Sequence, residues 1–108
     1  MSNVEGEIVG DKIQLRRSDE AKRPLVLRLN RIEGQIRGLR GMIEEDRYCL
    51  DEIQQITALT AALREVALMI TAEHVTAGAQ IAAEPDADKA LVIADMIRVL
   101  RAGMQYKA

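Results

Sequence analysis

The sequence predicts an all-α fold in which a three-helix subunit pairs with further copies of itself. Apolar residues recur at intervals of three and four along two long segments, and no segment shows the alternation typical of strands. Phe and Trp are absent, so the core consists of small aliphatic side chains that suit closely packed helices. Because two long helices and one short helix cannot enclose a core alone, we expect two protomers to form an antiparallel four-helix bundle.

The first long helix is predicted at the start of a domain that spans residues 18–108. Residues 1–17 mix Gly, Ser, Asn and charged residues without periodicity, which predicts a disordered N-terminal arm. Ser18 precedes two acidic residues and is a suitable N-cap, whereas Pro24 suits a first turn and offers an alternative start. The helix should extend to about residue 46. Its apolar stripe consists of Leu25, Leu29, Ile32, Ile36, Leu39 and Ile43.

A second apolar stripe with the same spacing predicts the second long helix. Gly78 and the segment 84–86 are expected to end or fray this helix. A shorter third helix, from about Asp86, carries Leu91, Met96, Val99 and Leu100. The seven-residue repeat of the second helix favours lengthwise pairing with other helices. The residues of its stripe are Cys49, Ile53, Ile56, Thr60, Leu63, Ala67, Ile70 and His74.

The charge of the chain is unevenly distributed. The formal net charge is −2, but the segment from Lys12 to Arg40 contains nine basic residues and only three acidic ones. A local basic region favours DNA binding more than the total charge opposes it. A single cysteine excludes an intramolecular disulfide. Neither a signal-type apolar run nor an uninterrupted apolar stretch of about 18 residues is present, so we expect a cytoplasmic protein without a membrane partner.

Cys49 and His74 stand at the two ends of the second stripe. Twenty-five residues of helix separate them, so both side chains face the same way but lie about 38 Å apart. In an antiparallel dimer, Cys49 would lie beside His74 of the partner subunit. Thiolate and imidazole suit Cu(I), Zn(II), or Ni and Co with extra ligands, and an exposed thiolate could also attack an electrophile. Simple packing of both residues is the remaining interpretation.

Three segments carry a resemblance to a known family. They are Arg28 to Gly38 (RLNRIEGQIRG), Glu44 to Cys49 (EEDRYC) and Gln54 to Ala58 (QQITA), and His74 follows them. Over roughly residues 22–106 the chain resembles the copper-sensitive operon repressors, a family that includes nickel/cobalt, formaldehyde and persulfide sensors. The resemblance implies homodimers with antiparallel second helices, flat homotetramers, and binding to double-stranded operator DNA until an inducer weakens the complex.

The resemblance also implies a sensing site. Cys49 and His74 match its first two positions, but copper sensors carry a second cysteine where this chain has Gly78. The histidines of nickel/cobalt sensors and the second cysteine of persulfide sensors are missing, and the only proline near the N-terminus is internal. Cu(I) or Zn(II) is therefore the preferred inducer, with an aldehyde or another thiol-reactive compound as the alternative. Tyr48 and Asp95 match residues that, in the family, hydrogen-bond near the histidine ligand and fix the orientation of its ring.

Arginines on the first two helices are the candidate DNA contacts. The resemblance implies that Arg28 contacts DNA. The family often has further basic residues where this chain has Asn30 and Glu65, and of their neighbours on the second helix only Arg64 is basic. Phosphate contacts of this kind predict strong salt dependence.

Three glycines, Gly34, Gly38 and Gly41, lie opposite the apolar stripe of the first helix, beside Arg31 and Arg37. Because glycine inside a helix costs about 1 kcal/mol relative to alanine, this strip suggests close approach to a phosphate backbone or a neighbouring dimer; a surface feature that the helix merely tolerates is the alternative.

Two further function classes compete with the inducer-released repressor. A metal-buffering or helical scaffold protein would need no DNA, but the basic region argues against it. An enzyme is disfavoured because the sequence has no paired carboxylates, nucleophile–base pair or phosphate-binding loop.

Overall fold

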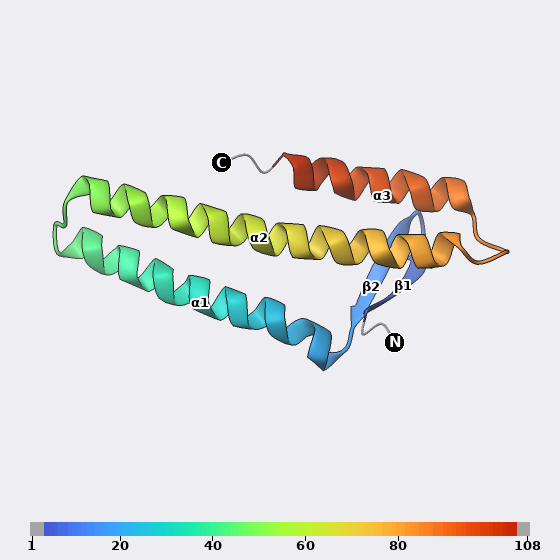
Figure 1. The fold of residues 1–108 in the computed structure, drawn as a ribbon, viewed down its shortest axis with the longest axis horizontal. Helices are drawn as coiled ribbons and strands as arrows, with labels where there is room; N and C mark the ends of the chain where they lie inside the picture. The colour runs from blue at the N-terminus through green and yellow to red at the C-terminus, as the bar shows by residue number, and fades with distance from the viewer. Residues whose placement is uncertain (1–3, 106–108) are drawn as a thin grey trace.

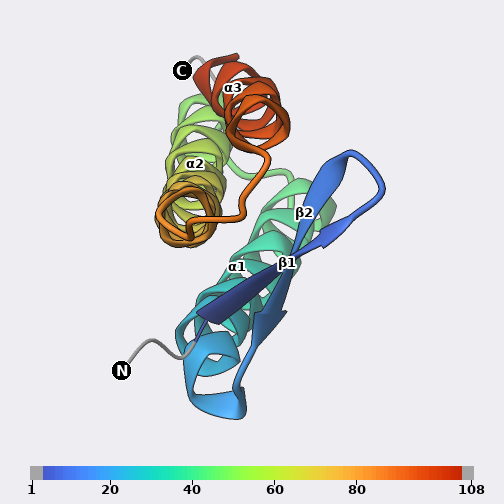
Figure 2. The same ribbon diagram turned by 90° about the vertical axis from the view of Figure 1, so that its right-hand side faces the viewer.

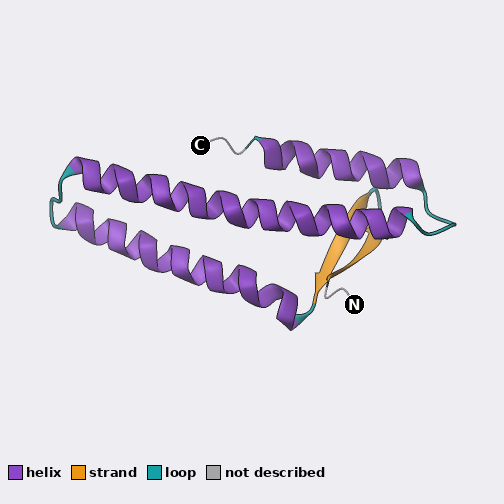
Figure 3. Cartoon of the chain, viewed as in Figure 1, coloured by secondary structure: helices purple, strands orange, loops and turns teal. Residues whose placement is uncertain are grey.

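The computed structural model describes residues 4–105, which form a β-hairpin followed by three helices (Figure 1). The helices are α1 (Asp19–Glu44), α2 (Cys49–Ala82) and α3 (Lys89–Met104). The central α2 is flanked by α1, which turns back along its N-terminal part, and by α3, which turns back along its C-terminal part. The three-helix subunit is confirmed, but the all-α class is wrong because two strands precede the helices (Figure 3).

The hairpin occupies the segment that was expected to be a disordered arm. Strand β1 (Val4–Val9) pairs with β2 (Lys12–Arg17) in antiparallel register, with Ile8 opposite Ile13. Gly10 begins the two-residue turn with a φ of +64°, a conformation that glycine adopts without steric cost. The prediction of an unstructured arm is therefore wrong for residues 4–17; residues 1–3, like residues 106–108 of the predicted domain, lie outside the described part.

The hairpin is held by the rest of the chain. An isolated two-stranded hairpin is marginal in water, so docking supplies its stability. Figure 2 shows it beside the helices, reaching from the start of α1 towards α3, and its strands contact all three helices. Ile13 is buried in this contact. A Cβ atom on Gly6 would lie 3.1 Å from side-chain atoms of both Ala77 and Ile81 of α2, so β1 approaches that helix closely.

The helix boundaries follow local capping chemistry. The Ser18 hydroxyl accepts a hydrogen bond from the Ala21 N–H at 3.1 Å, which confirms the predicted N-cap, and the alternative start at Pro24 is wrong. Helix α3 begins at Lys89 rather than near residue 86, because Asp88 caps it through the Leu91 N–H. Gly78 does not end α2, which continues to Ala82.

The apolar stripes divide between intrachain packing and open surface. Leu25 and Ile32 of α1 pack with Leu59 and Val66 of α2 in the buried cluster between these helices. The stripe predicted for α2 is instead largely exposed in the single chain, including Ile53, Ile56, Leu63 and Ile70. By length and composition alone, α2 is the one helix in residues 4–105 that could cross a membrane. A helix covered by a partner subunit has the same composition.

Replacing each member of the Ile8–Ile13 cross-strand pair tests the docking of the hairpin. Ile13 is 5% exposed and Ile8 is 43% exposed. Ile13→Ala should lower the free energy of unfolding by about 2–4 kcal/mol, because it removes buried methyl groups. Ile8→Ala is the matched control and should cost less than about 1 kcal/mol. Urea denaturation at one fixed protein concentration measures both, and equal losses would contradict the docked hairpin.

Candidate functional site

His74 lies near the C-terminal end of α2, under the hairpin. Its ring is buried, and Nε2 lies 2.6 Å from Oδ2 of Asp95 on α3. The structure thus brings together two of the residues that the sequence singled out. Their role toward an inducer stays a prediction.

Asp95 is a buried carboxylate with several donors. Its Oδ2 also accepts the backbone N–H of Ile13 at 3.2 Å, and its Oδ1 accepts Nη2 of Arg98 at 2.8 Å. Burial disfavours the charged form, but the hydrogen bonds from Arg98, His74 and Ile13 outweigh it and lower the pKa of Asp95. An ionised carboxylate can only accept, so His74 donates from Nε2. The lone pair of Nδ1 is then available to a ligand.

The hairpin covers this pair through further polar contacts. Nη2 of Arg98 donates to the backbone oxygen of Asp11 at 2.9 Å, and Nε of Arg17 lies 3.0 Å from Oε1 of Glu73. Sequence reasoning missed Ile13 and Arg98 as parts of the site. Arg98 stands three residues after Asp95 on a helix, a spacing that could have indicated the pair. The backbone contact of Ile13 left no signal in the sequence.

Cys49 and Tyr48 lie at the opposite end of α2. Cys49 is an exposed free thiol, and Tyr48 is also exposed. Within one chain a separation of 25 positions along one helix keeps Cys49 about 38 Å from His74. Among residues 4–105, no three His, Cys, Asp or Glu side chains gather as a metal site. The donor set therefore fits a soft metal ion only if two subunits contribute.

Gly78, one helical turn after His74, lies closely against side chains from α3 and β2. A Cβ atom there would lie 2.7 Å from Sδ of Met96 and 3.3 Å from Cδ1 of Ile13. The position that carries the second cysteine in copper sensors is thus filled from α3.

The candidate DNA-contact arginines lie mainly on α1. Arg28 and Arg31 line a hollow of about 170 Å³ between α1 and α2, together with Ile32, Gln35 and Ala62. Arg64 follows on α2, and its Nε is buried without a hydrogen-bond partner among the described residues. Arg37 is exposed farther along α1.

The glycine strip of α1 has no contact within the chain that requires glycine. A Cβ atom on Gly38 or Gly41 would meet nothing within 4 Å, and one on Gly34 would meet only Nη2 of Arg37, at 3.6 Å. Any need for close approach at this strip must therefore come from outside the subunit.

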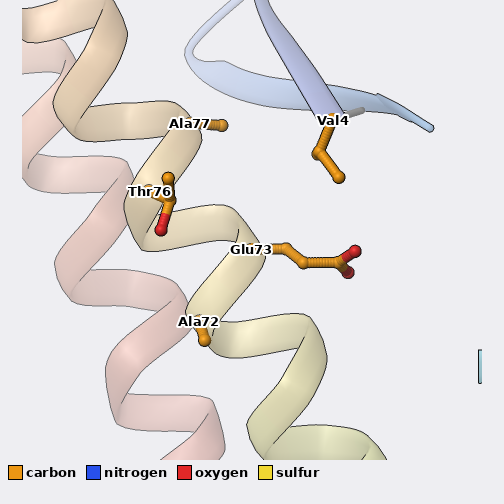
Figure 4. Close-up of a pocket in the computed structure, with 5 residues that line it drawn as sticks. All are labelled: Val4, Ala72, Glu73, Thr76 and Ala77. Atoms are coloured by element: carbon orange, nitrogen blue, oxygen red, sulfur yellow. The ribbon is translucent and has the colours of Figure 1, made fainter. Parts of the chain in front are cut away.

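A groove of about 280 Å³ between β1 and α2 is a second candidate site (Figure 4). Its lining contains one charged side chain, Glu73, which is already paired with Arg17. The groove offers neither thiol nor imidazole, so it does not explain the residues that the sequence singled out. The lining residues are Val4, Ala72, Glu73, Thr76 and Ala77.

Comparison with known proteins gives consistent matches. The model of a family described as "Metal-sensitive transcriptional repressor" matches residues 21–102. The chain is 57% identical over 49 residues to the copper-sensing transcriptional repressor RicR of Mycobacterium tuberculosis (strain ATCC 25618 / H37Rv), a match that covers 45% of this chain and 51% of RicR. It is 47% identical over 58 residues to the copper-sensing transcriptional repressor CsoR of Bacillus subtilis (strain 168), covering 54% and 57%. The matches thus span little more than half the length of these two relatives.

Two solved structures share the fold. The nickel-responsive transcriptional regulator InrS superposes with a TM-score of 0.72 and 33% identity, over 81% of this chain and 97% of InrS. The copper-sensing repressor CsoR with Cu(I) from Geobacillus thermodenitrificans NG80-2 has a TM-score of 0.65 and 34% identity, over 89% and 92%.

Asp95→Asn tests the polar centre of the site in metal-free protein. At pH 7 the variant should lose about 2 kcal/mol of unfolding free energy, since an amide cannot serve all the donors of the carboxylate. Because the pKa of Asp95 is lowered on folding, its stabilising contribution is complete above the unfolded value of about 3.9 and is lost as the pH falls through the folded value.

The difference between the wild type and Asp95→Asn should therefore shrink below about pH 4. Urea denaturation from pH 7 to pH 3 measures it. A difference that stays constant over this range would contradict an ionised Asp95.

Proposed function

Because the chain belongs to the family of metal-sensitive transcriptional repressors, we propose that it binds double-stranded operator DNA and is released by an inducer held between subunits. Its relatives are transcriptional repressors, so the chain is not an enzyme. The observation that carries the proposal is the buried His74–Asp95 pair, which orients an imidazole with one nitrogen left for a ligand. The protein would act in the cytoplasm, without a membrane partner.

The proposed assembly is a homodimer with antiparallel α2 helices, and two dimers form a homotetramer. The exposed apolar stripe of α2 supports this arrangement, because a contiguous apolar surface marks a site of interaction with a partner. Antiparallel pairing would bring Cys49 to His74 of the partner subunit, and the two-fold symmetry would create two such sites.

Cu(I) is the preferred inducer. A thiolate from Cys49 and Nδ1 of His74 of the partner subunit are suitable ligands for a soft ion, and the two curated relatives are named as copper-sensing. Zn(II) remains second, since it usually takes four ligands. The ion would supply a link between two subunits. It releases the operator only if it binds the DNA-free arrangement more tightly than the DNA-bound one.

A thiol-reactive inducer such as formaldehyde is the second candidate. The exposed thiol of Cys49 favours it, because an electrophile reaches an exposed thiol more readily than a buried one. A metal-buffering or scaffold protein without DNA binding is the alternative from another class, and an operator-binding measurement distinguishes it.

The DNA-contact surface is proposed along α1 and the adjoining part of α2. Arg28, Arg31 and Arg37 are exposed there, and Arg64 adds a fourth cation on α2. The glycine strip would let a phosphate backbone or a second dimer approach α1 closely, since no side chain of the subunit fills that space.

Cys49→Ser tests the inducer. Cu(I) should weaken operator binding by the wild type by at least about tenfold, and Cys49→Ser should remove this response while keeping the metal-free affinity. Fluorescence anisotropy with upstream DNA measures both, with Zn(II) and formaldehyde as parallel additions. Mass spectrometry completes the test: a covalent adduct on Cys49 without metal uptake would show that the inducer is an electrophile and not Cu(I).

Arg28→Ala tests the DNA surface. Loss of one phosphate contact should weaken binding to all sequences and reduce the slope of log K against log salt by about 1. Arg16→Ala is the matched control, because Arg16 is an exposed arginine on β2 that pairs with Glu7. An unchanged slope in Arg28→Ala, or the same change in both variants, would argue against the proposed surface.

A further inference from the structure

We propose that the thioether sulfur of Met96 is a third Cu(I) ligand, which takes the place of the side chain missing at Gly78. The inference rests on the proposed function, in which Cys49 and His74 of two subunits hold the ion. It adds a ligand from α3 that spacing along α2 cannot provide.

The first support is the position of the sulfur. Sδ of Met96 lies 2.7 Å, and its Cγ 2.8 Å, from the place where a Cβ atom of residue 78 would stand. Residues 74 and 78 are four apart on a helix and therefore share a face. Sδ of Met96 thus already fills the space where a side chain one turn after His74 would begin.

The second support is the place of Met96 on α3, next to the residue that pairs with His74. Met96 directly follows Asp95, whose Oδ2 lies 2.6 Å from Nε2 of His74. Met96 therefore lies on the same turn of α3 as the carboxylate that orients the imidazole. With Nε2 occupied as a donor, Nδ1 is the ring nitrogen left for an ion.

The third support is chemical. A thioether is a neutral, soft ligand that favours Cu(I) and contributes little to Zn(II) or Ni(II) binding. Thiolate, imidazole and thioether together carry one negative charge, which Cu(I) neutralises. Met96 is half-buried, and its unbranched side chain has three rotatable bonds with which it can adjust to an ion.

Selenomethionine labelling of the 108-residue chain gives a direct test. The chain has five methionines, and copper-edge X-ray absorption distinguishes selenium from the sulfur of Cys49. Cu(I)-loaded labelled protein should show selenium next to copper, and labelled Met96→Leu should lose it. Met104→Leu is the matched control because Met104, also on α3, is 75% exposed, and it should keep the selenium signal. A copper spectrum without selenium, or one unchanged in Met96→Leu, would overturn the proposal.

Affinity provides a second measurement. Met96→Leu preserves volume, so the variant should remain folded. Its Cu(I) affinity, measured by competition with a chromophoric chelator, should fall about 10- to 100-fold, whereas its Zn(II) affinity should change little. An unchanged Cu(I) affinity, or equal losses for both metals, would show that Met96 only fills space over Gly78.

The two levels of the proposal fail differently. If Cys49→Ser loses Cu(I) but Met96→Leu binds it like the wild type, only the thioether ligand is wrong. If Cys49→Ser keeps full Cu(I) affinity, the intersubunit site is wrong, and the role of Met96 falls with it.

Discussion

The carboxylate of Asp95 joins three parts of the chain that lie far apart in the sequence. One oxygen accepts from the imidazole of His74 on α2 and from the backbone of Ile13 in β2, and the other accepts from Arg98. A buried charge is tolerated only when such donors compensate its lost hydration. Because the imidazole and the hairpin share one oxygen, the orientation of His74 and the docking of the hairpin depend on each other.

The two halves of α2 differ in what surrounds them. The C-terminal part of α2 is closed by the hairpin and α3, whereas its N-terminal part presents Cys49 and much of the exposed apolar stripe. Antiparallel pairing would set the C-terminal part of α2 in one subunit against the N-terminal part of α2 in its partner. Ile13, whose backbone N–H donates to Asp95, lies in β2, and β2 leads through Ser18 directly into α1, the helix that carries Arg28.

The sequence predicted what depends on local periodicity and missed what depends on distant contacts. Amphipathic spacing gave the three helices, and Ser18 gave the first cap. Residues 4–17 were predicted to be disordered because of their Gly and charged residues, which concealed the two strands. The burial of Ile13 arises from helices that lie many residues later in the chain. Gly78 was predicted to end or fray the helix. The side chain that packs closely against it, Met96, lies on another helix and leaves no signal in the sequence around residue 78. Asp95 was found through family resemblance and not through spacing.

The tight contact at Gly78 has an evolutionary consequence. The Cβ atom of a cysteine introduced there would lie 2.7 Å from Sδ of Met96, so the methionine side chain would have to turn away or be replaced by a smaller one. We therefore expect positions 78 and 96 to change together among related sequences.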